Sequence, residues 1–454
     1  MRKIMPKFTT AALKWLNIIL EERFGHTFTL EQGQSGLKLS LNNVSLGYIL
    51  FPKLEEAFHL SRSDFPCSHW DADRAGWISV LGEALPAPCV SELPEPLIEE
   101  KNGCFVINYD ILGLTYWMLN RIEEIGRNDL DSHDRFPATA SHAYKNGYLE
   151  RPVVDEWLHI LGQVIQRTWP ALELKQHQFN MKVSHDVDRP SRYGFRKPFS
   201  LAKGIANDFF IKKDFKCLYN CILTKAHISK YIDKRDPANN FSWIMDQSEK
   251  NSIQSTFYFI SGLTCKMRDS DYDINHPAII NLMKEINNRG HKIGLHPSYN
   301  TYTDYHQLKI EANNLRSVLN KNNIKQASIG SRMHYLRWSQ PSTLLNCEAA
   351  QLSYDTSLGY ADHPGFRCGS SHEYQGFDPV SQNILNIRVQ PLIAMEGTII
   401  DSRYLGLGTG SEALNMFNML KENCRKLGGN YTLLWHNTEL INESKKNIYK
   451  QLIL

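Results

Sequence analysis

The sequence lacks any apolar run long enough to cross a membrane. Its longest apolar stretch near the N-terminus, residues 11–20, is interrupted by Lys14 and Asn17, whereas a spanning helix needs about 20 apolar residues. No small-residue cleavage site precedes Glu21, as a secretory signal would require. We therefore interpret this stretch as an amphipathic helix and expect a cytoplasmic protein.

Paired cysteines are also missing. The chain has 9 cysteines, an odd number, and they are scattered. Cys217 and Cys221 stand at helical spacing, but no second pair of the kind that binds zinc accompanies them. This pattern excludes a disulfide framework and favours reduced thiols. Internal repeats and low-complexity tracts are absent too.

Net charge is small, a formal +3, but it is unevenly distributed. Residues 1–175 carry 17 basic and 23 acidic side chains, and residues 176–454 carry 34 and 25. Between Arg189 and Arg235 there are 12 basic residues against 3 acidic ones. No recognised nucleic-acid motif accompanies this charge, so we expect no nucleic-acid partner.

A chain of 454 residues is long enough for two domains. We predict an N-terminal mixed α/β domain of unknown role at 1–175. It would contain a strand near residues 44–51, a proline-rich loop over 86–96, and helices at 111–125 and 153–168. Its carboxylates, histidines and glycines form no cluster that indicates chemistry.

Residues 176–454 alternate short strand patterns with helical ones. The strands are predicted at residues 179–188, 255–262, 292–296, 327–332, 352–357, 384–393 and 431–436. Helices are predicted between them, for example at 277–288 and 305–320. This order predicts an α/β fold: a deformed (β/α) barrel of about seven strands, preceded by the smaller mixed α/β domain and carrying a basic insertion at 189–254.

The most informative motif is Asp186-Val187-Asp188, at the end of the first of these strands. Side chains alternate across a strand, so Asp186 and Asp188 share one face while His185 and Val187 share the other. Two carboxylates this close need a cation or an arginine beside them. The pair is consistent with a general base next to a metal ligand, or with an acidic loop cap.

Ionisable residues stand at the carboxyl ends of most of these strands, the end that carries active sites in such barrels. Burying so many ionisable groups at one rim is costly unless they share a function. The set comprises Asp186, Asp188, His296, Arg332, His334, Asp355 and His436.

These motifs, in this order over residues 178–440, resemble the polysaccharide deacetylase, or NodB-homology, family. By that resemblance Asp186 is the catalytic base and Asp188 a metal ligand. The second motif is similar to Gly294–Asn300, with His296 as a ligand and Asn300 where the family has its second histidine.

The remaining motifs follow along the chain. Ser331–Tyr335 resembles the third, in which Arg332 pairs with the base and His334 stands where the family commonly has proline. Tyr354–Tyr360 and Gly365–Gly369 approximate the fourth and place Asp355 in the wall of the site. His436 matches the general acid of the fifth. The third metal ligand stays open between His334 and Asn300, and His334 is otherwise expected to contact the substrate.

The resemblance implies a hydrolase with a divalent metal, zinc by its donor types, that removes an N-acetyl group from an amino sugar or glycan. Alternatives are a degenerate barrel that binds glycan without cleaving it and an amidase acting on a non-sugar C–N bond. The expected substrate-binding residues are Tyr299, Tyr335, Trp338, Arg367 and Arg189.

The basic segment 189–235 has three interpretations. It can be a solvated helical surface, or Arg189, Arg192, Arg196 and Lys197 can hold the phosphate of a nucleotide- or lipid-linked sugar. Apolar residues among its lysines also permit peripheral membrane contact. A phosphate-linked substrate would suit a cytoplasmic enzyme of surface-polysaccharide biosynthesis.

Overall fold

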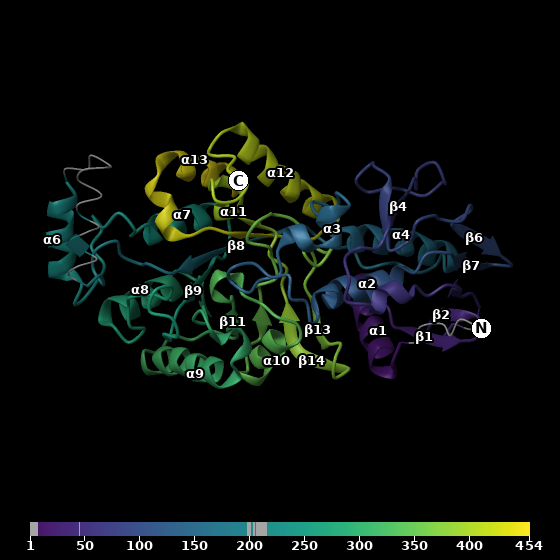
Figure 1. Cartoon of the computed structure of the whole chain (residues 1–454), viewed down its shortest axis with the longest axis horizontal. Coiled ribbons are helices and arrows are strands. Elements are labelled where there is room, and N and C mark those ends of the chain that lie inside the picture. Colours follow the sequence, from purple (N-terminus) through teal and green to yellow (C-terminus); the bar gives the residue numbers. More distant parts are fainter. Residues whose placement is uncertain (1–7, 45, 198–200, 203–204, 206–215) are drawn as a thin grey trace.

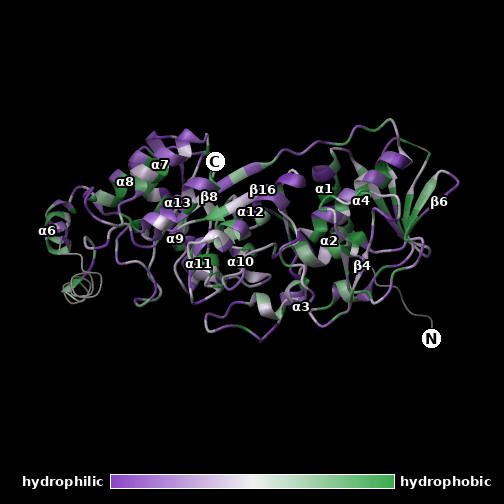
Figure 2. Ribbon diagram, turned by 90° about the horizontal axis from the view of Figure 1, so that it is seen from above, coloured by the Kyte–Doolittle hydropathy of each residue, from purple (hydrophilic) through white to green (hydrophobic). Residues whose placement is uncertain are grey.

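The computed structural model describes residues 8–44, 46–197, 201, 202, 205 and 216–454. The chain is a mixed α/β protein with two main sheets and a two-stranded ribbon. It is elongated: β6 (Ile98–Lys101) and α6 (Cys217–His227) lie at opposite ends of the molecule in Figure 1 and Figure 2. None of the helices in the described ranges is long and apolar enough to span a bilayer. All nine cysteines are free.

A five-stranded sheet belongs to the N-terminal region. Its spatial order is β1 (Phe28–Gly33), β2 (Gly36–Leu41), β3 (Ile49–Phe51), β7 (Cys104–Ile107) and β6. The helices of this region are α1 (Thr10–Phe24), α2 (Ile111–Leu119), α3 (His142–Lys145) and α4 (Val153–Thr168). Short 3-10 turns lie at η1 (Glu56–His59), η2 (Ile122–Glu124) and η3 (Ala138–Ala140).

The predicted helices of this region are confirmed, and their ends have local causes. The Thr9 side chain accepts a hydrogen bond from the amide of Ala12, and Gly25 ends α1 with a φ of 79°. The predicted helix 111–125 is divided into α2 and η2 by Arg121, whose φ is 49°.

The proline-rich stretch after residue 85 is only partly a loop, so that prediction was wrong in part. β4 (Cys67–Trp70) and β5 (Leu85–Pro88) pair antiparallel, with His69 opposite Pro86 and Cys67 opposite Pro88. Prolines cannot donate to a ladder, but a strand of a two-stranded ribbon has one open edge that tolerates them.

The second sheet has nine strands. In spatial order they are β13 (Tyr374–Asp378), β14 (Asn383–Val389), β12 (Tyr354–Asp355), β11 (Gly330–Ser331), β10 (Lys292–Leu295), β9 (Thr256–Phe259), β8 (Asn180–Val187), β16 (Asn430–Leu434) and β15 (Ala394–Met395). All neighbours are parallel except β13, which is antiparallel to β14. The seven predicted strands are present, whereas β13 and β15 were not predicted.

The two end strands of the parallel part of the sheet, β14 and β15, belong to one segment of chain. β14 pairs with β12, and the same segment continues through Gln390 and Ile393 into β15, which pairs with β16. The amide of Gln390 donates to the carbonyl of Asp355 over 2.8 Å, and the amide of Ile393 donates to that of Thr432 over 3.2 Å. The row of hydrogen-bonded strands nevertheless has two ends, so the strands of the described residues do not form a closed ring.

Helices alternate with many of these strands along the chain and lie around the sheet (Figure 1). They are α7 (Phe241–Lys250), α8 (Pro277–Asn288), α9 (Tyr305–Lys321), α10 (Ser342–Ala349), α11 (Glu396–Ile400), α12 (Ser411–Lys426) and α13 (Glu443–Leu452). The 3-10 turns are η5 (Thr301–Thr303), η6 (His334–Leu336) and η7 (Asn437–Ile441). The predicted helices at 277–288 and 305–320 are confirmed as α8 and α9.

The interior of the second sheet packs tyrosine rings against glycines. A Cβ on Gly294 would lie 2.2 Å from the ring of Tyr258, and one on Gly330 would lie 2.1 Å from the ring of Tyr354. The two tyrosine hydroxyls are 3.4 Å apart. These glycines leave the space that the rings fill, so the interior is packed below the strand ends.

The two halves of the chain share one continuous cluster of buried apolar side chains. Polar contacts cross the same boundary. Arg367 donates to both Glu124 oxygens over 3.0 and 2.6 Å, and the side chain of Asp155 accepts from Ser370 and Ser371. The N-terminal region is therefore held to the segment between β12 and β13 by a buried, partly charged contact.

Candidate functional site

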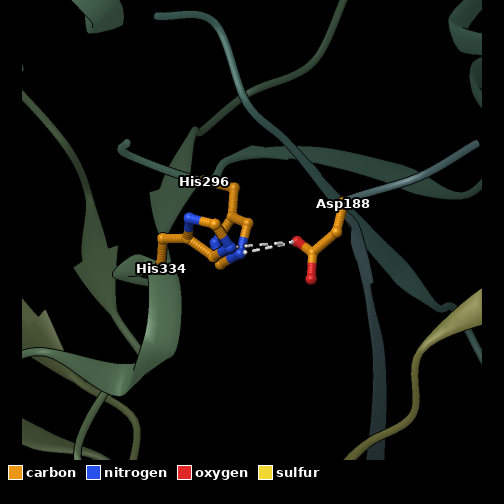
Figure 3. A group of neighbouring side chains, drawn as sticks. All are labelled: Asp188, His296 and His334. Atoms are coloured by element: carbon orange, nitrogen blue, oxygen red, sulfur yellow. Dashed lines mark ion pairs between the residues drawn. The ribbon is translucent and has the colours of Figure 1, made fainter. Parts of the chain in front are cut away.

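Three side chains converge at the carboxyl ends of the parallel strands. Asp188 follows β8, His296 follows β10, and His334 begins η6 after β11. One oxygen of Asp188, Oδ1, lies 3.2 Å from Nε2 of His296 and 3.7 Å from Nε2 of His334. The ligand atoms of the three residues all lie within 4.8 Å of one another. Figure 3 shows both imidazoles pointing at that one carboxylate oxygen.

The far nitrogen of each imidazole is already engaged. Nδ1 of His296 lies 2.5 Å from the carbonyl oxygen of Arg332, and Nδ1 of His334 lies 3.1 Å from Oδ1 of Asp269. A proton on either Nδ1 can be donated to its oxygen, and the Nε2 atoms, which lie nearest to Asp188, are then available as ligands. This is how proteins orient histidines that ligate a metal.

Asp188 has the charge that such a group needs. Burial by itself would raise the pKa of Asp188, but the neighbouring His334 and His296 outweigh it and hold the pKa well below its usual range. Its Oδ1 is buried and has no hydrogen-bond partner among the described residues. One carboxylate and two imidazoles with an unsatisfied oxygen fit a divalent cation such as zinc.

Asn300 does not lie with these ligands. Its side-chain oxygen accepts from Nη1 of Arg337 over 3.0 Å, and its Nδ2 donates to the carbonyl of Thr264 over 3.3 Å. These bonds commit the amide of Asn300 to Arg337 and Thr264, so the structure does not bring this predicted ligand to Asp188. Asp188, His296 and His334 form the group of possible metal ligands, called the metal group below.

Asp186 lies beside the metal group on the same face of β8, as strand alternation predicts. Its Oδ2 is 3.7 Å from Nε2 of His296, and its Oδ1 is 4.0 Å from Nη1 of Arg332. Asp186 Oδ1 and Arg332 Nε and Nη1 are buried without hydrogen-bond partners in the described part of the chain. A carboxylate and a guanidinium are thus held close together with unused hydrogen-bonding capacity.

Arg332 itself is fixed from behind. Its Nη2 donates to Oγ of Ser184 over 2.8 Å, and its guanidinium lies 5.2 Å from the centre of the Tyr258 ring. The side chain is fully buried. It can therefore orient the carboxylate of Asp186.

His436 faces Asp188 from the end of β16. Its Nε2 is 3.8 Å from Oδ2 of Asp188, and its Nδ1 is 2.5 Å from Oε1 of Glu396. Burial would lower the pKa of His436, but the charge and hydrogen bond of Glu396 outweigh it and raise the pKa to about 10. The imidazole is therefore held as a proton donor at neutral pH.

A cavity of about 340 Å³ lies among these side chains. Its wall includes Asp186, Asp188, His296, His334, Glu396 and His436. Arg189 and Tyr335, both predicted to contact substrate, line it as well. Tyr335 is partly exposed and has a φ of 63°. The other cationic residues in the wall are Arg135, Arg268 and Arg403.

Three other predicted site residues lie outside this cavity. Tyr299 is buried with its hydroxyl 3.0 Å from Nδ1 of His133, and Trp338 is buried with the Arg367 guanidinium 5.7 Å from its ring. Arg367 donates to Glu124 and to the carbonyl of Gly359. The structure therefore does not bring Tyr299, Trp338 or Arg367 to this cavity, and Arg367 joins the two halves of the chain.

Asp355 also differs from its predicted place in the wall of the site. Its carboxylate accepts from Oγ of Ser331 over 2.9 Å and from the amide and Oγ of Ser357 over 3.0 and 2.8 Å. Burial raises its pKa above the ordinary value despite these bonds. Asp355 is not among the residues that line the cavity, so it holds the strand ends together beneath the site.

Comparisons with known proteins add little about chemistry. Residues 4–170 match the model of a family of unknown function, DUF7033. No curated protein matches the chain. A structure described as a polysaccharide deacetylase from Mycobacterium smegmatis is 13% identical with a TM-score of 0.39, covering 62% of this chain and 84% of that one. Puue allantoinase is 10% identical with a TM-score of 0.35, covering 63% and 85%. Both similarities are weak, so the chemistry has to be inferred from this chain's own residues.

Sequence reasoning missed several residues that line the cavity, among them Glu396, Asp269 and Arg135. Glu396 directly follows β15, a strand too short to show a pattern, and Asp269 lies in a loop. Arg135 comes from the N-terminal region, where Asp131 binds its Nε over 2.8 Å and the carbonyl of Tyr335 accepts from its Nη1 over 2.8 Å. Glu396 follows a strand end, which is a detectable signal, whereas nothing local marks Arg135.

Proposed function

We propose that this chain is a metal-dependent hydrolase that cleaves an amide C–N bond, and that it removes an N-acetyl group from an amino sugar. The observation that carries the proposal is the grouping of Asp188, His296 and His334 with Asp186 and His436 on one cavity. Such a group offers a metal site, a base and an acid within one small space.

Asp188, His296 and His334 would hold the divalent ion, which we propose to be zinc. When bound, the ion would lower the pKa of a coordinated water and polarise a carbonyl oxygen. Asp269 and the carbonyl of Arg332 would keep the two imidazoles in the tautomer that binds metal.

Asp186 would accept the proton of the attacking water. Its Oδ1 has no hydrogen-bond partner among the described residues and lies 4.0 Å from Nη1 of Arg332, whose planar guanidinium would orient the carboxylate. General-base catalysis by such a carboxylate contributes about 10²- to 10⁴-fold to rate.

His436 would protonate the leaving nitrogen, because an amide nitrogen leaves readily only as an amine. The pKa of about 10 keeps its proton available at neutral pH, and Glu396 fixes the ring through Nδ1. The acid and the base thus approach the metal group from different strands, β16 and β8.

The proposed substrate is an N-acetylated sugar, free or as part of a glycan or its precursor in surface-polysaccharide synthesis. The half-exposed ring of Tyr335 in the cavity wall supports it, since sugar faces stack on aromatic rings.

We further propose that the second sheet is a deformed barrel closed by residues 383–395. We also propose that 1–175 and 176–454 are separate domains and that the protein is cytoplasmic.

Acetate release tests the function. Purified protein loaded with zinc, cobalt or manganese is incubated with N-acetylated mono- and oligosaccharides, and we expect acetate in the wild type and at least about 100-fold less in Asp186→Asn. Metal bound without acetate release, together with retained sugar binding, would indicate a glycan-binding barrel instead. Release of ammonia or an amine from non-sugar amides alone would indicate a different amidase.

A further inference from the structure

A second cavity of about 610 Å³ adjoins the first. The two share Arg189, Thr438 and Glu439 in their walls, so they meet beside His436. The rest of the second wall carries Arg192 and Arg196 from the loop after β8. It lies within the described part of the basic segment; residues 198–200, 203, 204 and 206–215 of that segment lie outside the described residues.

The second cavity is strongly cationic. Lys445 on α13 faces it together with the three arginines. Its one acidic wall residue, Glu439, is paired with Lys445. Arg189 is exposed. The described residues of this wall thus carry four basic side chains and one acidic one.

The loop that carries these arginines is held in a defined conformation. The buried carboxylate of Asp236 accepts from Oγ of Ser191 over 2.5 Å and from the amide of Arg192 over 2.8 Å. The fully buried Asn437 donates to the carbonyls of Arg189 and Ala238 over 3.0 and 2.8 Å. Because Asn437 directly follows His436, the same short segment positions the acid of the first cavity and the arginines of the second.

We propose that the second cavity binds a phosphoryl group, as a monoester or diphosphate, carried by the substrate whose amide enters the first cavity. Planar guanidinium groups bind phosphate oxygens in pairs, and several converging on one space favour a multiply charged anion over a carboxylate. This inference rests on the proposed function for the place of the amide, but the phosphate site is testable without it. Lys197, which was predicted to hold phosphate, does not line this cavity, whereas Lys445 does.

Binding of inorganic phosphate to the full-length protein tests the site. We expect saturable binding in calorimetry at low ionic strength, weakened about tenfold or more in Arg192→Ser/Arg196→Ser, since hydrogen bonds to charged groups are lost. Lys445→Gln removes charge from the opposite wall and provides a second variant with an expected loss of several-fold. The matched control is Arg425→Ser, which removes a charge on α12 that pairs with Glu422 away from both cavities.

Unchanged phosphate affinity in folded Arg192→Ser/Arg196→Ser and in Lys445→Gln would overturn the proposal. Sedimentation with phosphatidylglycerol vesicles, against phosphatidylcholine vesicles, separates a soluble phosphate source from a lipid one. Vesicle binding without saturable phosphate binding would also overturn it and indicate a membrane surface. Phosphate binding that is lost in the variants, in a protein that releases no acetate, would leave the site standing while the proposed function fails.

Discussion

At the scale of single residues, the metal group is defined by the atoms behind it. Asp269 and the carbonyl of Arg332 hold the Nδ1 atoms of His334 and His296, so both Nε2 atoms face Asp188. The amide of Asn300 is instead bound to Arg337 and to the carbonyl of Thr264. The identity of the third ligand therefore depends on hydrogen bonds one layer outside the site.

Replacing His334 tests this assignment. We expect the wild-type protein to bind about one divalent ion per chain, and His334→Ala to lose it, because a site with two protein ligands holds zinc weakly. Asn300→Ala is the matched control and should keep the metal. Metal analysis after dialysis measures both, and metal loss in Asn300→Ala with retention in His334→Ala would contradict the assignment.

Asp269, whose Oδ1 lies beside Nδ1 of His334, should affect metal binding nearly as much as His334 itself. In Asp269→Asn the charge that holds Nδ1 of His334 is removed, and we expect metal affinity to fall about 10- to 100-fold. Competition with a chromophoric chelator measures the affinity. Asp273→Asn, a neutralisation in the same loop but outside the cavity, serves as control; equal affinities in all three proteins would contradict this role.

His185 shows the opposite face of the same strand. It is fully buried, with Nδ1 2.7 Å from the carbonyl of Trp435, and burial lowers its pKa to about 3. Between pH 6.5 and 3 the unfolded chain binds a proton that the folded chain does not. Stability should therefore fall as the pH is lowered through this window, by about 1.4 kcal/mol per pH unit at most.

Urea unfolding at pH 7, 6, 5 and 4 measures this effect. In His185→Gln the slope of the unfolding free energy against pH should decrease, although it will not vanish, because burial also lowers the pKa of His372 to about 3. A slope identical to wild type would show that His185 does not contribute to the acid sensitivity.

At the scale of elements, neighbouring strands β9 and β10 connect packing to the site. Gly294 lies opposite Tyr258 in the ladder, and the Tyr258 ring lies under the guanidinium of Arg332. The absence of a Cβ on Gly294 lets the ring occupy this place. A glycine in a strand interior is thus required by the side chain that supports Arg332.

Gly294→Ala should therefore affect both stability and activity. Overpacking of this kind costs about 1–3 kcal/mol, and displacement of Tyr258 should shift Arg332 away from Asp186. We expect a lower midpoint in urea and a lower kcat at saturating metal. Gly33→Ala is the control, because nothing lies within 4 Å of a Cβ at Gly33; equal behaviour of the two variants would contradict the packing role.

At the scale of the whole molecule, a buried charge network joins the two halves. Arg121 pairs with Glu123 and Glu124, and Glu124 also pairs with Arg367. All four side chains are almost fully inaccessible to solvent. Removal of one partner leaves an uncompensated charge in the interior, which is far more costly than loss of a surface pair.

Arg367→Ala should accordingly reduce the unfolding free energy by about 3–5 kcal/mol. Metal content and KM of the remaining folded protein should stay near wild type, because Arg367 does not line the cavity. Arg403→Ala is the comparison for KM and stability, since Arg403 is exposed and lines the cavity. A raised KM in Arg367→Ala with unchanged stability would restore Arg367 as a substrate contact.

The sequence by itself determined the local features of this protein. The alternation of β8 placed Asp186 and Asp188 on one face and His185 on the other, and apolar spacing located α4, α8 and α9. These predictions succeed because their physical cause, the period of a strand or helix, acts between neighbours in the chain.

Only the tertiary structure decided which residues share the site. His334 rather than Asn300 joins Asp188 because of where the loops after β10 and β11 come to lie. Arg135 enters the cavity from a segment with no local signal, while Arg367 is withdrawn into the contact between the two halves. Such placements depend on strand register and long-range packing, which are determined by the whole chain and not by the spacing of neighbours.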